Sequence, residues 1–170
     1  MDLGYAVLRL LHVFNAVFWV GSTIVMVGYI KPAVRASGPA GTQFMQTLLA
    51  RRLPAAMNVS AFLTIVAGLL LYARDSGGFQ AQAWLSTPPA QAWGLGGLIG
   101  IIALLVGLVA AWQGRGLARI SAEIQAGGGR PSAEQNGRLE RLQARLSTLA
   151  SLNLTLLIIA LVLMVIARAL

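Results

Sequence analysis

The side chains best suited to chemistry lie in the first 30 residues, within one long apolar segment. On a helix with about 100° per residue, its polar and larger functional side chains share an arc of roughly 140°. An ionisable group inside an apolar helix costs free energy unless it has a partner. The segment therefore predicts an inward-facing stripe, made by Tyr5, Arg9, His12, Asn15, Trp19, Ser22 and Met26.

His12 supports two interpretations. A neutral imidazole needs a donor and an acceptor partner, and a hydrogen bond to another helix can supply one of them. Imidazole is also a common axial ligand of haem b and a ligand of copper. Because His12 is the only histidine, a further metal ligand would have to be Met164, water or a group from another chain. In the haem interpretation Arg9 pairs with a propionate, Trp19 forms part of the pocket wall, and Asn15 belongs to the site.

Other kinds of chemistry lack the residues they need. The chain has no cysteine, which excludes disulfides, thiolate nucleophiles and iron–sulfur clusters. All five carboxylates fall in gaps or tails between the apolar segments, so carboxylate-based hydrolysis or proton relay within the membrane is not expected. The sequence leaves open whether the protein is an enzyme, and a non-enzymatic role is favoured.

The composition identifies the class of protein that must position these residues. Of 170 residues, 57% are hydrophobic and 11% are charged, and the mean hydropathy is +0.74. A soluble domain carries roughly 25% charged residues. The net charge is +8, and most of the basic residues lie in short gaps between apolar blocks. This placement indicates membrane topology rather than nucleic-acid binding. We therefore expect an integral membrane protein whose first partner is the lipid bilayer.

Four apolar runs have about the 20 residues that a membrane-spanning helix needs. They cover about residues 3–30, 55–72, 92–112 and 148–167 of a single domain, 1–170. The first run is too long for a signal peptide and contains Arg9 and His12, so we expect it to be retained. Ten Lys and Arg residues lie in the first and third gaps, against one, Arg74, in the second. This asymmetry predicts that both termini lie outside the cytoplasm.

The third gap, about 113–147, resembles two helices more than a loop. Apolar residues at 3 and 4 spacing continue the third span and lead into the fourth. Glycines 127–129 end the first of these helices, while Ser132 and Gln135 match a capping box for the next. The expected fold is thus an all-α antiparallel bundle of four transmembrane helices, with helices three and four extended as a cytoplasmic hairpin. The leucines and isoleucines of its seam are Leu117, Ile120, Ile124, Leu139, Leu142, Leu146 and Leu149.

Small residues on the third span indicate close helix contact. Gly96, Gly100 and Gly107 form a smooth ridge, suited to packing within the bundle or between subunits. Together with the hairpin, this ridge is a candidate surface for a homo-oligomer or a larger membrane complex.

Residues 11–21, with 30–33 closing the first span and 51–53 preceding the second, resemble the bacterial membrane proteins grouped with the copper-resistance CopD-like domain. They are similar, more distantly, to the HemJ-type protoporphyrinogen oxidases. The resemblance covers chiefly residues 5–72 and implies a four-helix protein of the bacterial inner membrane. It also implies haem binding by a histidine early in the first helix, which here is His12. The HemJ-type enzymes use a lysine in a later helix, whereas the one lysine here is Lys31.

Two functions follow as expectations. The first is a redox or metal-related membrane protein with haem or copper at His12. The alternative is a cofactor-free accessory subunit of a larger respiratory or photosynthetic membrane complex. A transporter is disfavoured, because the spans show neither inverted repetition nor matching Gly/Pro breaks.

Overall fold

The computed structural model describes residues 2–170, without the side chains of residues 49 and 50, and within that range it is helical with no strand. The helices are α1 (Leu3–Val25), a π-helical turn η1 (Met26–Ile30), α2 (Lys31–Ala36), α3 (Gly38–Ala50), α4 (Leu53–Asp75), α5 (Gln82–Leu85), α6 (Pro88–Ala126) and α7 (Ala133–Ile166).

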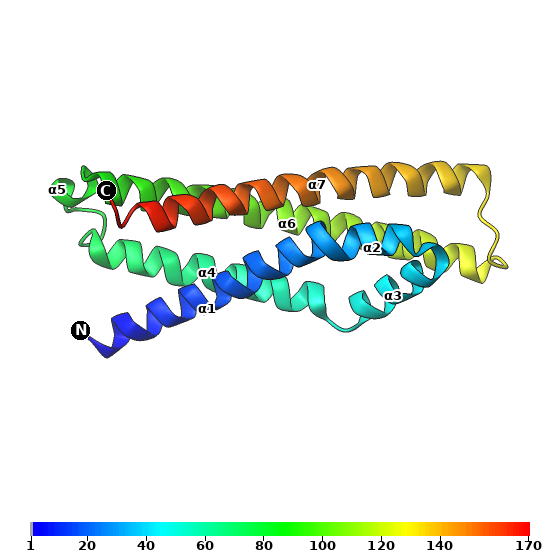
Figure 1. The fold of residues 1–170 in the computed structure, drawn as a ribbon, viewed down its shortest axis with the longest axis horizontal. Helices are drawn as coiled ribbons and strands as arrows, with labels where there is room; N and C mark the ends of the chain where they lie inside the picture. Colours follow the sequence, from blue (N-terminus) through cyan, green and yellow to red (C-terminus); the bar gives the residue numbers. More distant parts are fainter. Residues whose placement is uncertain (1) are drawn as a thin grey trace.

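Four helical stretches of the described chain are long and apolar enough to cross a membrane, as the hydropathy pattern predicts. They are Leu3–Ala36, Leu53–Asp75, Pro88–Ala126 and Ala133–Ile166. In Figure 1, α6 and α7 lie side by side, and α1 packs mainly against α4. Both termini lie at one end of the molecule, here called the terminal end; the turn between α6 and α7 lies at the other, here called the turn end.

The first span is longer than the sequence indicates, because helix continues past Ile30 to Ala36. Pro32 has no N–H, and in a regular α-helix its ring would clash with the carbonyl four residues earlier. The π-helical turn removes this conflict: the N–H of Lys31 donates to the carbonyl of Met26, five residues back. The helix therefore absorbs the proline by widening one turn.

A further helix, α3, occupies part of the gap between the first two predicted spans, where the sequence interpretation placed none. Gly38 turns the chain with φ of +55°, and Pro39 lies in the first turn of α3. Gly41 then rests on the carbonyl of Val34, leaving no room for a side chain. This contact holds α3 against α2.

The buried core between the helices contains few residues. Trp19, Ala61, Ala103 and Leu157 form one buried cluster, with one residue from each of the four long helices. Many large apolar side chains elsewhere point outward, as they do in a protein surrounded by lipid.

The glycine ridge of α6 packs inside this chain. A side chain at Gly96 would meet Met164 and Leu163 of α7, and one at Gly100 would lie 3.3 Å from Ile65 of α4. Gly107 lies beside the amide of Asn153. Gly96 and Gly100 therefore bring α6 close to its own neighbours.

The structure at the turn end confirms the predicted capping box and the glycine turn between α6 and α7. The N–H of Ser132 donates to Gln135 Oε1 at 2.8 Å, and the N–H of Gln135 donates to Ser132 Oγ at 3.2 Å, which completes the capping box. Arg138 pairs with Glu134 one turn earlier, at 3.3 Å. Gly128 and Gly129 adopt φ of +94° and +78°, which glycine tolerates best.

Aromatic side chains gather at the terminal end, around the short helix α5. Tyr72 of α4 meets Trp84 of α5 edge-on at 5.1 Å between ring centroids, and Trp84 stacks on Trp93 of α6 at 6.4 Å. The hydroxyl of Tyr72 also donates to the carbonyl of Ala90 at 3.2 Å. These contacts fix the connection between α4 and α6.

Candidate functional site

The predicted polar stripe of α1 faces other parts of the protein. None of its seven residues is fully exposed, and Asn15 and Trp19 are buried. On the opposite side of α1, Leu10, Phe14 and Val17 are each about two-thirds exposed or more. The helix therefore turns its apolar side outward, as the 3.6-residue period requires.

His12 is half-buried against α4. Its Nδ1 lies 2.8 Å from the backbone carbonyl oxygen of Thr64. A carbonyl oxygen only accepts hydrogen bonds, so Nδ1 carries the ring proton and donates a hydrogen bond to the Thr64 carbonyl. In that tautomer the lone pair lies on Nε2, for which no hydrogen bond is described within residues 2–170.

Gly68 provides the space in which this ring lies. A Cβ at position 68 would stand 2.8 Å from His12 Cε1 and 2.9 Å from Nδ1, closer than a side chain allows. Thr64 and Gly68, one turn apart on α4, thus fix one edge and one side of the imidazole. A histidine that coordinates a metal commonly donates its other N–H to a carbonyl or carboxylate in this way.

No described contact joins the other predicted site residues to His12. Asn15 donates from Nδ2 to the carbonyl of Leu11 at 2.8 Å, so one N–H of its amide is used within α1. Trp19 is 5% exposed and belongs to the central cluster, two turns from His12. Arg9 is half-buried and makes no ion pair within residues 2–170.

Met164 packs at a different helix interface from His12. Its methyl group would lie 3.2 Å from a Cβ at Gly96, which places it between α6 and α7. His12, in contrast, packs between α1 and α4. The two candidate metal ligands are therefore not brought together by any described contact. Within residues 2–170 no group of three or more His, Asp or Glu side chains is placed to hold a metal ion.

Three contacts that the sequence does not predict tie the start of α1 to α4 at the terminal end. Arg74 forms an ion pair with Asp2 at 2.6 Å and lies over the ring of Tyr5, while the hydroxyl of Tyr5 donates to Asp75 at 3.3 Å. The hydrogen bond from Arg74, aided by the N–H of Gly4, lowers the pKa of the Asp2 carboxyl below its ordinary value of 3.8. These contacts support the helix pair that holds His12.

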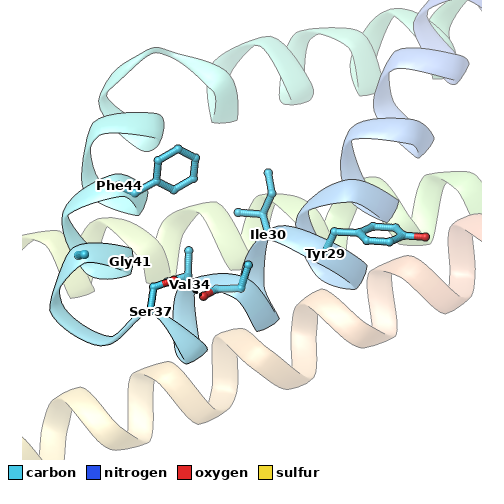
Figure 2. A pocket seen from close by; sticks show the side chains of 8 residues that line it. Tyr29, Ile30, Val34, Ser37, Gly41 and Phe44 are labelled. Atoms are coloured by element: carbon cyan, nitrogen blue, oxygen red, sulfur yellow. Dashed lines mark hydrogen bonds between the residues drawn. The ribbon is translucent and has the colours of Figure 1, made fainter.

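A separate cavity of about 420 Å³ lies between the end of the first span and α3 (Figure 2). The hydroxyl of Tyr29 points away from Phe44 and Gly41 in Figure 2, and the hydroxyl of Ser37 already donates to the carbonyl of Ala33 at 2.9 Å. The cavity suits an apolar chain and offers no acid–base pair for catalysis. Its lining comprises Tyr29, Ile30, Ala33, Val34, Ser37, Ala40, Gly41 and Phe44.

Comparisons with known proteins add no relative: no family model, no curated protein and no solved structure matches this chain.

Proposed function

We propose that the chain is a four-helix antiparallel bundle of the bacterial inner membrane that binds haem b through Nε2 of His12. The observation that carries this proposal is the 2.8 Å contact between His12 Nδ1 and the Thr64 carbonyl, which leaves Nε2 as the coordinating atom. The resemblance of residues 5–72 to CopD-like and HemJ-type proteins points to the same residue.

The residues around His12 fit haem better than copper. A haem iron takes four ligands from its own macrocycle and needs only one from the chain, whereas a copper site needs two or more protein ligands. Met164, the remaining candidate ligand, packs against α6 rather than beside His12. Copper binding would therefore require a ligand from a second chain.

Each nearby residue has a definite task in this proposal. Thr64 and Gly68 orient the imidazole, and Arg9, half-buried without an ion pair in residues 2–170, supplies a guanidinium for a propionate. Trp19 and Asn15 stabilise α1 below the site. Haem held by these residues would supply one-electron chemistry.

The proposed orientation places the terminal end, and with it His12, toward the outside of the cell. Ten Lys and Arg residues in the first and third gaps, against Arg74 alone in the second, support a cytoplasmic position for the turn end. The extended ends of α6 and α7 would then form the cytoplasmic hairpin.

The test is an absorption spectrum with metal analysis of the full chain, purified from a host that is supplied with both haem and copper. We expect a Soret band and iron at up to one equivalent per chain. Copper without a Soret band would favour the copper alternative. Protein that contains neither would contradict the cofactor proposal and favour the accessory subunit.

A further inference from the structure

A second candidate binding site lies between α6 and α7 toward the turn end, away from His12. It is a groove of about 170 Å³ lined by Ile120 of α6 and by Arg138, Arg141, Leu142 and Arg145 of α7. The three arginines are spaced by three and four residues, so they occupy one face of α7. Two apolar side chains and three guanidinium groups thus share one small hollow, here called the arginine groove.

The charge of the arginine groove is only weakly balanced by the chain. Arg138 pairs with Glu134 at 3.3 Å, whereas Arg141 and Arg145 make no ion pair within residues 2–170. Like charges at this spacing on a helix repel one another. A bound anion would relieve the repulsion, and a guanidinium matches the geometry of a phosphate with two parallel hydrogen bonds.

The position of the groove along α7, relative to the membrane boundary, indicates the source of such a phosphate. Lys31 donates to Ser147 Oγ at 2.6 Å, which sets Ser147 level with Lys31, the first residue of α2 and a charged one. Tyr29 and Trp112 are each 70% exposed near this level, as expected for aromatic side chains at a membrane boundary. Arg145 lies about 3 Å and Arg141 about 9 Å beyond Ser147. A headgroup layer is roughly 5–7 Å thick, within reach of both side chains.

We propose that the arginine groove binds the phosphate headgroup of an anionic phospholipid in the leaflet at the turn end. Arg141 and Arg145 coordinate the phosphate, and Ile120 and Leu142 contact the apolar part of the same lipid. Basic pockets between membrane helices recognise anionic headgroups through this combination of charge and apolar surface. The site is independent of the haem proposal.

The experiment measures binding of phosphatidylglycerol to the full chain in detergent micelles, by native mass spectrometry and by the unfolding temperature. The test variant is Arg141→Gln with Arg145→Gln. The control is Arg119→Gln with Arg130→Gln, which removes the same charge outside the groove. We expect the apparent affinity to fall about 30-fold in the test variant, as for two lost arginine contacts with an anionic lipid, and to change less than about threefold in the control.

Three further measurements make the outcome decisive. Phosphatidylcholine is expected to bind no better to the wild type than to the test variant, and unfolding without lipid checks that the variant folds. Equal loss of affinity in both variants would mean that binding depends only on net charge. That result would overturn the proposal that the arginine groove is a specific site. If inorganic phosphate alone stabilises the protein as much as phosphatidylglycerol does, the groove is a site for soluble anions. That result would overturn the proposal that its ligand is a lipid.

Discussion

The imidazole of His12 lies in the space that any side chain at position 68 would occupy. A Cβ on Gly68 would stand 2.8 Å from His12 Cε1, and one turn away the Thr64 carbonyl accepts a hydrogen bond from Nδ1–H. Orientation of the ring therefore depends on the absence of a side chain as much as on the hydrogen bond. The pair His12 and Gly68 fixes how α1 and α4 approach each other.

Replacing Gly68 with alanine is expected to displace the imidazole from Thr64. The added methyl overpacks the contact at a cost of about 1–3 kcal/mol, and any haem bound by Nε2 loses its orientation. The unfolding temperature and the Soret absorbance per chain should both fall. Gly97→Ala is the matched control, since a Cβ at Gly97 meets nothing within 4 Å. Equal behaviour of the two variants would show that Gly68 does not position His12.

The contact between Lys31 and Ser147 connects the start of α2 to α7. Its length of 2.6 Å and its charged donor predict that Ser147→Ala destabilises the protein by about 1 kcal/mol. The measurement is equilibrium unfolding in detergent. Thr148→Ala serves as the control, because Thr148 is exposed and its hydroxyl donates only to Ala144 in its own helix. A smaller loss for Ser147→Ala than for the control would contradict the assigned role.

The proposed orientation can be tested with single cysteines, because the chain has none of its own. Gln80→Cys and Arg130→Cys place a thiol at exposed positions near the terminal and turn ends. We expect a membrane-impermeant maleimide to label Gln80→Cys from outside the cell and to label Arg130→Cys only after permeabilisation. The reverse pattern would invert the topology and place His12 near the cytoplasmic face.

The ion pair between Asp2 and Arg74 predicts that the stability of the protein depends on pH only in the acidic range. The pKa of Asp2 is lowered in the folded protein, so the stabilisation is complete above the unfolded value of about 3.8 and is lost as pH falls through the lower folded value. Asp2→Asn should therefore lower the unfolding temperature by a constant amount above pH 5, and by a smaller amount below pH 4. Because both side chains are well exposed, salt should reduce the shift. A difference that grows toward low pH would contradict this sign.

The number of spans and one helix cap could be predicted because their signals are local. Runs of about 20 apolar residues identify the spans, and Ser132 with Gln135 identifies the start of α7. The continuation through Pro32 could not be predicted in the same way. It depends on a π-helical turn, whose cost and benefit are set by packing rather than by residue type.

The candidate site shows the same division between local and tertiary information. Helical periodicity correctly predicts that His12 faces inward, because that depends only on α1. Its partner is a backbone carbonyl, which every residue carries, so no pattern distinguishes Thr64. The sequence offers Met164 as a further ligand for a metal at His12. The rotation of α7, which residue type does not reveal, places Met164 against Gly96 instead.

The most direct test of the central proposal is the optical spectrum of wild-type and His12→Ala protein, each expressed with added haem and measured with and without imidazole. We expect a Soret band in the wild type, its loss in a folded His12→Ala variant, and its partial return when imidazole enters the vacated space. Protein without a Soret band in the wild type, or an unchanged band in His12→Ala, would contradict haem ligation by His12.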